Sequence, residues 1–241
     1  AWLLGIPVIL HEQNAVAGLT NQWLSKIANK VFQAFPGAFP TADVVGNPVR
    51  EDVVALAEPE QRMAERDGDI RILVMGGSQG AKILNDTLPV SMAQLGEGFT
   101  VVHQAGKNNQ QQVIEQYKSH SVDNVQVTEF IDDVAQAYEW ADLLVCRSGA
   151  LTVSEVSAAG VGSIFVPFMH KDRQQALNAD HLVECGAALM IEQPQLTADK
   201  LANTIAELDR NELKMMATKA RQAAKLDADV TVAEAIKALA K

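Results

Sequence analysis

Short runs of apolar, β-branched residues alternate with longer amphipathic segments from residue 70 onward. This alternation is typical of repeated strand and helix units that build a parallel sheet. Six strands are predicted, at residues 70–75, 100–103, 125–128, 143–146, 163–166 and 188–191. Six parallel strands with intervening helices form a doubly wound α/β domain, in which ligands bind beyond the carboxyl ends of the strands.

The chain before residue 50 shows the same pattern in a shorter form. An apolar run at 6–10 predicts a buried strand, followed by a polar corner at 11–14, a helix over 19–29 and a strand over 30–34. Residues 1–5 read like the end of a helix stopped by Gly5, so we expect the chain to be a truncated piece of a longer unit.

Two further segments organise the chain. A charge-dense stretch from 50 to 69, preceded by several glycines and prolines, predicts a domain boundary. Residues 201–241 are rich in Ala, Lys and Glu and predict helices with a break near 227–229.

The composition narrows the function classes. With 48% hydrophobic and 21% charged residues, the 241-residue chain is globular rather than disordered. Lys and Arg total 20 against 30 for Asp and Glu, and the resulting net charge of -10 makes a nucleic-acid partner unexpected. The two cysteines suit a reducing, cytoplasmic compartment. No stretch approaches the roughly 20 apolar residues of a membrane span, so any membrane contact is expected to be peripheral.

A glycine-rich loop at residues 76–81 joins the first strand of the large sheet to a helix. Its glycines free backbone N–H groups to approach an anion near the positive end of that helix, and Ser78 adds a hydroxyl donor, which together favour phosphate. The same glycines would also suit a tight turn that binds nothing. A nicotinamide dinucleotide is disfavoured, because the loop lacks the G-x-G-x-x-G spacing and the next strand ends without an acidic residue.

Two more loops carry candidate chemistry. The loop at 146–155 has the same strand-to-helix design, and Glu155 could accept hydrogen bonds from the vicinal hydroxyls of a ribose. Thr152 and Glu155 equally fit a capping box with no ligand role. The loop at 167–175 places Gln174 and Gln175 at a helix start, where amides suit sugar hydroxyls but are also ordinary solvated side chains.

The spacing of the residues supports neither a metal site nor nucleophilic catalysis. The five histidines are scattered, and no zinc, calcium or G-x-S-x-G nucleophile motif occurs in the sequence. We therefore predict no metal and no cofactor, and we expect His103 and His181 to be structural or surface residues.

Six segments taken in order resemble the MurG family of bacterial UDP-N-acetylglucosamine transferases: HEQN at 11–14, NPVR at 47–50, GGSQGA at 76–81, EFIDD at 129–133, CRSGALT at 146–152 and HKDRQQ at 170–175. The resemblance covers essentially the whole chain. It implies a GT-B fold with a UDP-GlcNAc donor domain at 50–226. Residues 1–49 would be the C-terminal part of a second, Rossmann-like acceptor domain, and a helix at 227–241 would pack back on it.

The resemblance also implies a reaction. It is the inverting transfer of N-acetylglucosamine from UDP-GlcNAc to undecaprenyl-pyrophosphoryl-MurNAc-pentapeptide, lipid I to lipid II, in peptidoglycan synthesis. The enzyme would sit peripherally on the cytoplasmic face of the inner membrane. Trp2 and Lys26 could belong to an aromatic and basic membrane patch, although Trp2 would equally suit the core.

The family motifs assign roles to individual residues. Arg50 and Ser78 would contact the diphosphate, Ile131 the uracil and Glu155 the ribose. Asn14 and the two glutamines would hold the sugar, and the helix start after Gly149 would offer N–H groups. The implied substrate-binding set is Asn14, Arg50, Ser78, Ile131, Ala150, Leu151, Thr152, Val153, Ser154, Glu155, Gln174 and Gln175.

One departure from the family pattern limits the activity that we expect of this chain. The opening glycine-rich loop of the family, with a histidine often proposed as catalytic, has no counterpart here, so we expect no independent catalysis. His11 and Glu12 are the remaining, weak candidates for a base. Two alternatives stay open: a nucleotide-sugar-binding module of a two-chain glycosyltransferase, and a UDP-sugar epimerase-like enzyme.

Overall fold

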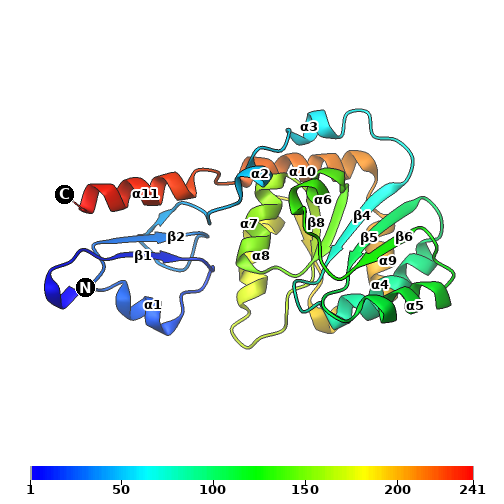
Figure 1. Cartoon of the computed structure of the whole chain (residues 1–241), viewed down its shortest axis with the longest axis horizontal. Coiled ribbons are helices and arrows are strands. Elements are labelled where there is room, and N and C mark those ends of the chain that lie inside the picture. The colour runs from blue at the N-terminus through cyan, green and yellow to red at the C-terminus, as the bar shows by residue number, and fades with distance from the viewer. Residues whose placement is uncertain (1, 241) are drawn as a thin grey trace.

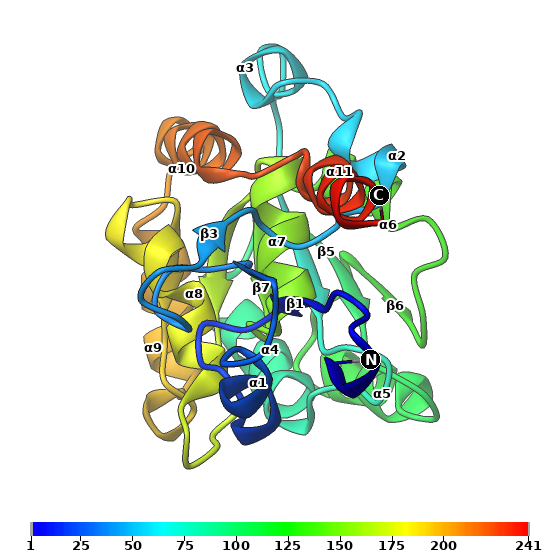
Figure 2. The same ribbon diagram turned by 90° about the vertical axis from the view of Figure 1, so that its left-hand side faces the viewer.

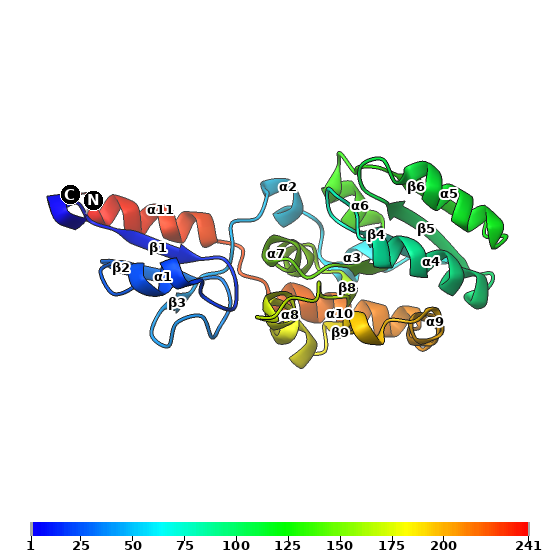
Figure 3. The same ribbon diagram turned by 90° about the horizontal axis from the view of Figure 1, so that it is seen from below.

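The computed structural model describes residues 2–240, apart from the side chain of Trp2, and shows two parallel β-sheets (Figure 1). The small sheet has strand order β1-β2-β3, and the large sheet has order β6-β5-β4-β7-β8-β9. The small sheet and α11 lie at one end of an elongated molecule, with the large sheet at the other (Figure 3).

The elements follow in chain order. The strands are β1 Ile9–Glu12, β2 Lys30–Gln33, β3 Asp43–Val44, β4 Ile70–Met75, β5 Phe99–Gln104, β6 Val125–Thr128, β7 Leu143–Cys146, β8 Gly162–Phe165 and β9 Ala188–Met190. The α-helices are α1 Leu19–Leu24, α2 Glu51–Val54, α3 Pro59–Arg62, α4 Lys82–Leu95, α5 Gln110–Ser119, α6 Val134–Trp140, α7 Ala150–Ala159, α8 Gln174–Glu184, α9 Ala198–Ala206, α10 Arg210–Ala223 and α11 Ala228–Leu239. Short 3-10 turns occur at Trp2–Leu4 and Gln193–Gln195.

The large sheet confirms the six predicted strands, with boundaries shifted by at most one residue. Side chains alternate between its two faces, as the strand period of two requires. Ile72 and Val74 enter one buried cluster with α4, α5 and α9, whereas Leu73 enters the other with α6, α7 and α8. Helices therefore cover both faces, and the loops at the carboxyl edge are left free for a ligand.

The N-terminal expectations need three corrections. The first strand begins at Ile9 rather than at residue 6 and includes His11 and Glu12, because its register pairs Ile9 with Lys30. The helix predicted over 19–29 ends at Leu24, because the N–H groups of Lys26 and Ile27 bond carbonyls three residues back in tighter turns, and the backbone and side chain of Asn29 then bond Val8. The opening segment forms a 3-10 turn rather than the end of an α-helix, although Gly5 does follow it at a positive φ of 68°.

The segment from residue 201 onward is helical as predicted, but it is broken twice. The second break, residues 224–227, is close to the predicted one and precedes α11. The first separates α9 from α10, where Asp209 and Glu212 form a reciprocal capping box that starts α10. The helix α11 runs alongside the small sheet rather than the large one (Figures 1 and 3), and it lies in the foreground when the molecule is seen from that end (Figure 2).

Candidate functional site

The glycine-rich loop between β4 and α4 is a turn that only glycine can form. Gly77 and Gly80 have φ of +80° and +75°, a region that side chains rarely adopt. The N–H of Gly80 closes the turn by donating to the carbonyl of Gly77 at 2.8 Å. A Cβ on Gly80 would lie 2.0 Å from the carbonyl oxygen of Ala105, whereas a Cβ on Gly77 would meet open space. The tight-turn interpretation thus explains Gly80, and Gly77 is the glycine that faces outward.

The loop between β7 and α7, residues 147–149, opens the second helix N-terminus. Gly149 is the N-cap and makes no side-chain cap, so the N–H groups of Ala150, Leu151 and Thr152 begin the helix without intrahelical acceptors. The N–H of Val153 already bonds the carbonyl of Gly149 at 2.9 Å. This first turn has the geometry that anion binding requires.

Val153 and Ser154 belong to the packed side of α7. The side chain of Val153 is fully buried in the core. The Ser154 hydroxyl accepts a hydrogen bond from Asn47 Nδ2 at 3.1 Å. Their side chains therefore do not face the open loop, and their predicted substrate contacts stay predictions.

Glu155 lies one turn further along α7. Its carboxylate contacts side chains from other segments rather than the backbone N–H groups at the start of its own helix. Tyr138 donates its hydroxyl to Glu155 Oε2 at 3.1 Å, and Arg50 Nε lies 3.6 Å from Oε1. The capping-box alternative is wrong, because Gly149 rather than Thr152 is the N-cap. Burial raises the pKa of the Glu155 carboxyl, while the Arg50 charge and the Tyr138 bond oppose that rise in part.

Arg50 is thereby placed beside the predicted ribose ligand. It precedes α2, and about half of its side chain remains exposed. Ser78 lies on the exposed surface of the glycine-rich loop. No contact between these two predicted diphosphate ligands is present among the described residues.

The loop between β8 and α8, residues 166–173, holds the two glutamines at the first turn of α8. Arg173 precedes that helix in a left-handed conformation, with φ of 52°. Gln175 Oε1 accepts a hydrogen bond from the N–H of Phe168 at 2.8 Å, which closes the loop on itself. Its amide nitrogen has no partner among the described side chains and stays available for a hydroxyl.

Asn14 reaches the large sheet from the segment after β1. Asn178 Nδ2 donates to Asn14 Oδ1 at 3.3 Å, and Asn178 Oδ1 accepts from the N–H of Ala15 at 2.8 Å. Because Asn178 lies on α8, one turn beyond Gln174, Asn14 is tied to the helix that carries the two predicted sugar-binding glutamines.

Ile131 lies in the segment between β6 and α6. It lines a hollow of about 420 Å³ with its exposed neighbour Phe130 and with Trp140 of α6. This places an apolar surface after β6, two strands away from β4 in the sheet. A flat base could pack there.

One cavity of about 530 Å³ joins the three loops. Gly76, Gly77, Gly149, Thr152 and Gln175 line it, at the carboxyl ends of β4, β7 and β8. The sequence expectation that two helix N-termini face one crevice is therefore confirmed.

Arg147, Phe168 and Gln193, which are absent from the predicted set, also line this cavity. The Arg147 guanidinium donates to the carbonyl of Val166 at 3.0 Å and to Gln193 Oε1 at 2.8 Å, and lies over the Phe168 ring. Burial lowers the pKa of Arg147. Its place directly before Ser148 in the loop motif was the available sequence indication.

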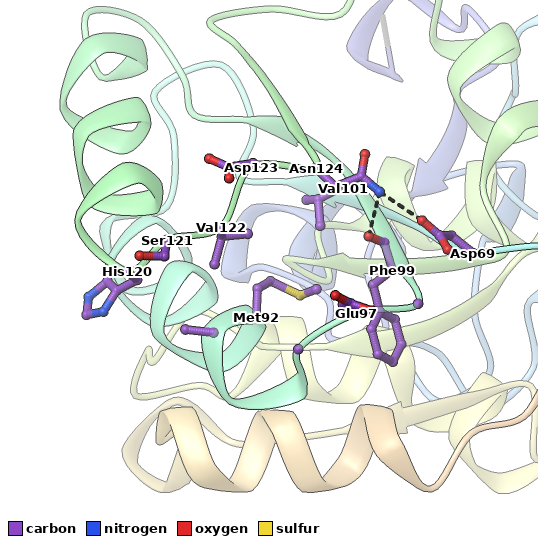
Figure 4. Close-up of a pocket in the computed structure, with 13 residues that line it drawn as sticks. Asp69, Met92, Glu97, Phe99, Val101, His120, Ser121, Val122, Asp123 and Asn124 are labelled. Carbon is purple, nitrogen blue, oxygen red and sulfur yellow. Dashed lines mark hydrogen bonds between the residues drawn. The ribbon is translucent and has the colours of Figure 1, made fainter.

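A larger cavity, about 1000 Å³, lies at the opposite edge of the large sheet (Figure 4). Asp69, Phe99 and Asn124 line it, and Asn124 Nδ2 bonds Asp69 Oδ2 at 2.8 Å. Because Asp69 and Asn124 directly precede β4 and β6 and Phe99 begins β5, the cavity lies at the amino ends of the strands, away from the edge where such sheets bind ligands.

The remaining histidine and acid candidates are engaged in local structure. His11 Nε2 bonds the carbonyl of Gly46 at 2.8 Å, and the buried Glu12 carboxylate accepts from Asn14 and Asn21. His103 is structural as expected: it is fully buried, and burial lowers its pKa to about 3. His181 is packed against Phe35.

Two absences among residues 2–240 bear on metals and membranes. No group of three or more His, Cys, Asp or Glu side chains in this range could hold a metal ion. No described helix is long and apolar enough to cross a bilayer. Of the expected membrane pair, the side chain of Trp2 lies outside the described residues, while Lys26 stacks on Trp23 with Nζ 4.3 Å from the ring centroid.

Comparisons with known sequences match this architecture. The model of the glycosyltransferase family 28 C-terminal domain matches residues 71–236, and that of the N-terminal domain matches residues 1–33. A UDP-N-acetylglucosamine--N-acetylmuramyl-(pentapeptide) pyrophosphoryl-undecaprenol N-acetylglucosamine transferase of Vibrio atlanticus is 97% identical over 241 residues, which is 100% of this chain and 68% of the relative. The transferase of the same name from Vibrio cholerae is 75% identical over 239 residues, 99% of this chain and 68% of the relative.

Solved structures agree. The crystal structure of Acinetobacter baumannii MurG has a TM-score of 0.91 and 40% identity, covering 98% of this chain and 67% of that chain. A putative UDP-N-acetylglucosamine 2-epimerase from Listeria monocytogenes has a TM-score of 0.66 at 15% identity, covering 95% of this chain and 67% of that one. The second likeness concerns the fold alone. The fold is that of a GT-B glycosyltransferase.

Proposed function

This chain belongs to glycosyltransferase family 28, and from that premise we propose that it provides the donor side of an N-acetylglucosaminyltransferase. The donor is UDP-N-acetylglucosamine, and the acceptor is the undecaprenyl-pyrophosphoryl-linked N-acetylmuramyl-pentapeptide named for its relatives. The product is the lipid-linked disaccharide used in peptidoglycan synthesis. The observation that carries this proposal is the single cavity lined by all three predicted donor loops.

The division of the chain follows from the two sheets. Residues 50–226 are assigned to the donor domain and residues 1–49 to part of the acceptor domain. Residues 227–241 are assigned to a helix returning to the acceptor domain. The course of α11 beside the small sheet supports this division (Figure 3).

The reaction is an inverting displacement at the anomeric carbon. An acceptor hydroxyl forms the new C–O bond and loses its proton to a base, while the bond from the anomeric carbon to the diphosphate oxygen breaks and UDP leaves from the opposite face. Negative charge grows on the departing diphosphate. The N-termini of α4 and α7 stabilise that charge with fixed N–H groups, and a lost donor of this kind costs about 3 kcal/mol of transition-state stabilisation.

Binding to the donor domain can be measured directly. We expect calorimetric titration to show binding of UDP-N-acetylglucosamine that exceeds the binding of UDP-N-acetylgalactosamine and of NAD. The affinity should be the same with and without EDTA, because helix termini rather than metal hold the diphosphate. A folded chain that binds none of the three would contradict the donor-site assignment, and equal binding of both sugars would contradict the sugar selectivity.

We assign this chain to the cytoplasmic face of the inner membrane as a peripheral enzyme, because the acceptor named for its relatives is linked to undecaprenol, a membrane lipid. Leu19 and Trp23 project from α1 with 76% and 69% of their surfaces exposed, beside Lys26. An aromatic and basic surface of this kind suits an anionic lipid interface.

The membrane surface can be tested by liposome co-sedimentation of the full-length Vibrio atlanticus relative. Replacing Trp23 by Ala and Lys26 by Glu should reduce partitioning into anionic vesicles several-fold. Met215→Ala on α10, which removes an apolar side chain that is 57% exposed, is the matched control. Equal partitioning of both variants would rule out the α1 surface.

A further inference from the structure

Gln104, the last residue of β5, lies between the two parts of the predicted nucleotide site. β5 pairs with β4 on one side and with β6 on the other, so Gln104 is level with Met75 and Thr128. Its Nε2 donates to the carbonyl of Gly77 at 3.0 Å and to the carbonyl of Glu129 at 3.2 Å. One buried amide thus connects the glycine-rich loop to the segment that leads to Ile131.

The amide orientation follows from these partners. Both neighbours are carbonyl oxygens, so only the NH₂ end can face them. The opposite atom, Oε1, is buried without a hydrogen-bond partner among the described residues. A buried, unsatisfied acceptor is costly, which indicates that this side chain is retained for its two donors rather than for stability.

Holding the Gly77 carbonyl also orients the next N–H group. In a trans peptide the C=O and N–H point in opposite directions, so the N–H of Ser78 points away from Gln104. Within the described chain this N–H has no acceptor. Gln104 therefore fixes the direction of a free donor in the loop predicted to hold the diphosphate.

A second contact makes the loop after β5 and the glycine-rich loop one unit. A Cβ on Gly106 would lie 2.1 Å from the N of Gly80, just as a Cβ on Gly80 would strike Ala105. Asn85 Nδ2 donates to the same Ala105 carbonyl at 3.0 Å, and its Oδ1 lies 3.1 Å from His103 Nε2. The two backbones are thus locked together beneath Gln104.

We propose that Gln104 is a positioning residue that couples occupation of the nucleobase segment, residues 129–131, to the shape of the glycine-rich loop. It touches neither half of the ligand. Its role is to transmit order from the base end to the diphosphate end through one amide. This inference rests on the proposed function, because it assumes that a uridine nucleotide spans the two segments.

Uridine, which lacks phosphate, is the probe that tests the coupling in the unmodified chain. Amide hydrogen exchange should slow at residues 129–131 and also at residues 76–81 when uridine binds. Protection confined to 129–131 would overturn the proposal.

Substitutions give a second test. Gln104→Met keeps the shape and removes both donors, so affinity for UDP should fall about 10-fold. Gln104→Glu places a carboxylate against two carbonyls, so its affinity for UDP should fall further. At low pH the protonated acid can donate one hydrogen bond, so the affinity of this variant should recover relative to that of the unmodified chain. Gln110→Glu is the matched control, since Gln110 Nε2 donates to the Val127 carbonyl at 2.8 Å without contacting the glycine-rich loop.

The outcomes separate the two proposals. If the unmodified chain binds neither UDP-N-acetylglucosamine nor UDP, the proposed function fails. If it binds them and Gln104→Met binds UDP equally well, only the coupling fails. If Gln110→Glu loses as much UDP affinity as the Gln104 variants, the loss reflects general destabilisation and the coupling is overturned. The same conclusion follows if the loss of UDP affinity in Gln104→Glu is constant with pH.

Discussion

The loops that begin α4 and α7 differ in what holds their shape, although both follow strands of one sheet and line one cavity. The glycine-rich loop depends on backbone conformations and close approaches that exclude a side chain, above all at Gly80. The β7–α7 loop does not: Gly149 has φ of −62°, and a Cβ there would lie 3.8 Å from Thr152 Oγ1, an ordinary contact.

Side chains hold the second loop instead. Arg147 ties it to the β8–α8 loop, and Tyr138 and Arg50 hold the Glu155 carboxylate one turn later. The first loop offers backbone N–H groups, which suit a diphosphate, and the second adds a carboxylate, which suits ribose hydroxyls. Under the proposed function, similar strand-to-helix turns on one sheet recognise different parts of one ligand.

The largest expected effect comes from removing the space that the first loop needs. Gly80→Ala combines a positive φ with a contact to backbone that cannot yield, so the free energy of unfolding should fall by about 3 kcal/mol. Urea unfolding measures this loss. UDP affinity should fall more than 10-fold in the fraction that remains folded.

Gly149→Ala is the partner variant in the second loop. Its φ suits any residue, and the weaker N-cap should cost about 1 kcal/mol or less. Equal losses of stability in the two variants would show that the loops do not differ as described.

The sequence was sufficient for the elements of the large sheet and for the loops of the site. Strand boundaries followed from apolar runs such as 70–75, because burial on both faces leaves little freedom in register. The convergence of the three loops followed from the parallel topology, since carboxyl ends share one edge.

Contacts between distant segments could not be predicted in this way. The Tyr138 bond to Glu155 and the Asn14 bond to Asn178 join residues whose partners depend on tertiary packing. The bonds from Asn29 to Val8, which leave no helical bond for Asn29 after α1, could not be predicted for the same reason. Gly106 carried no motif, and its need for glycine arises from a φ of +85° together with the approach of Gly80.

The next largest effect concerns the carboxylate of the second loop. Glu155→Gln keeps the size of the side chain but removes the charge that strengthens hydrogen bonds to ribose hydroxyls, so affinity for UMP should fall about 30-fold. Calorimetry with UMP and with 2′,3′-dideoxy-UMP measures the effect. The unmodified chain should prefer UMP strongly, and the variant should not.

A preference for UMP that survives in Glu155→Gln would mean that another group recognises the ribose. The glycine-rich loop would then be the part to examine for that contact, and the division between backbone and side-chain recognition would fail.

The smallest effect tests how the Tyr138 hydroxyl changes the pKa of the Glu155 carboxyl. The Tyr138 hydroxyl opposes the rise in the pKa of Glu155, so Tyr138→Phe should raise that pKa further. Since the ionised form accepts from ribose, UMP affinity falls as pH drops through the pKa of Glu155, and this fall should begin at a higher pH in the variant. The difference should reach about 3-fold on the acidic side and vanish where Glu155 is fully ionised. Tyr117→Phe removes an equally buried hydroxyl that bonds His103 instead, and a profile identical to that control would disprove the link to Glu155.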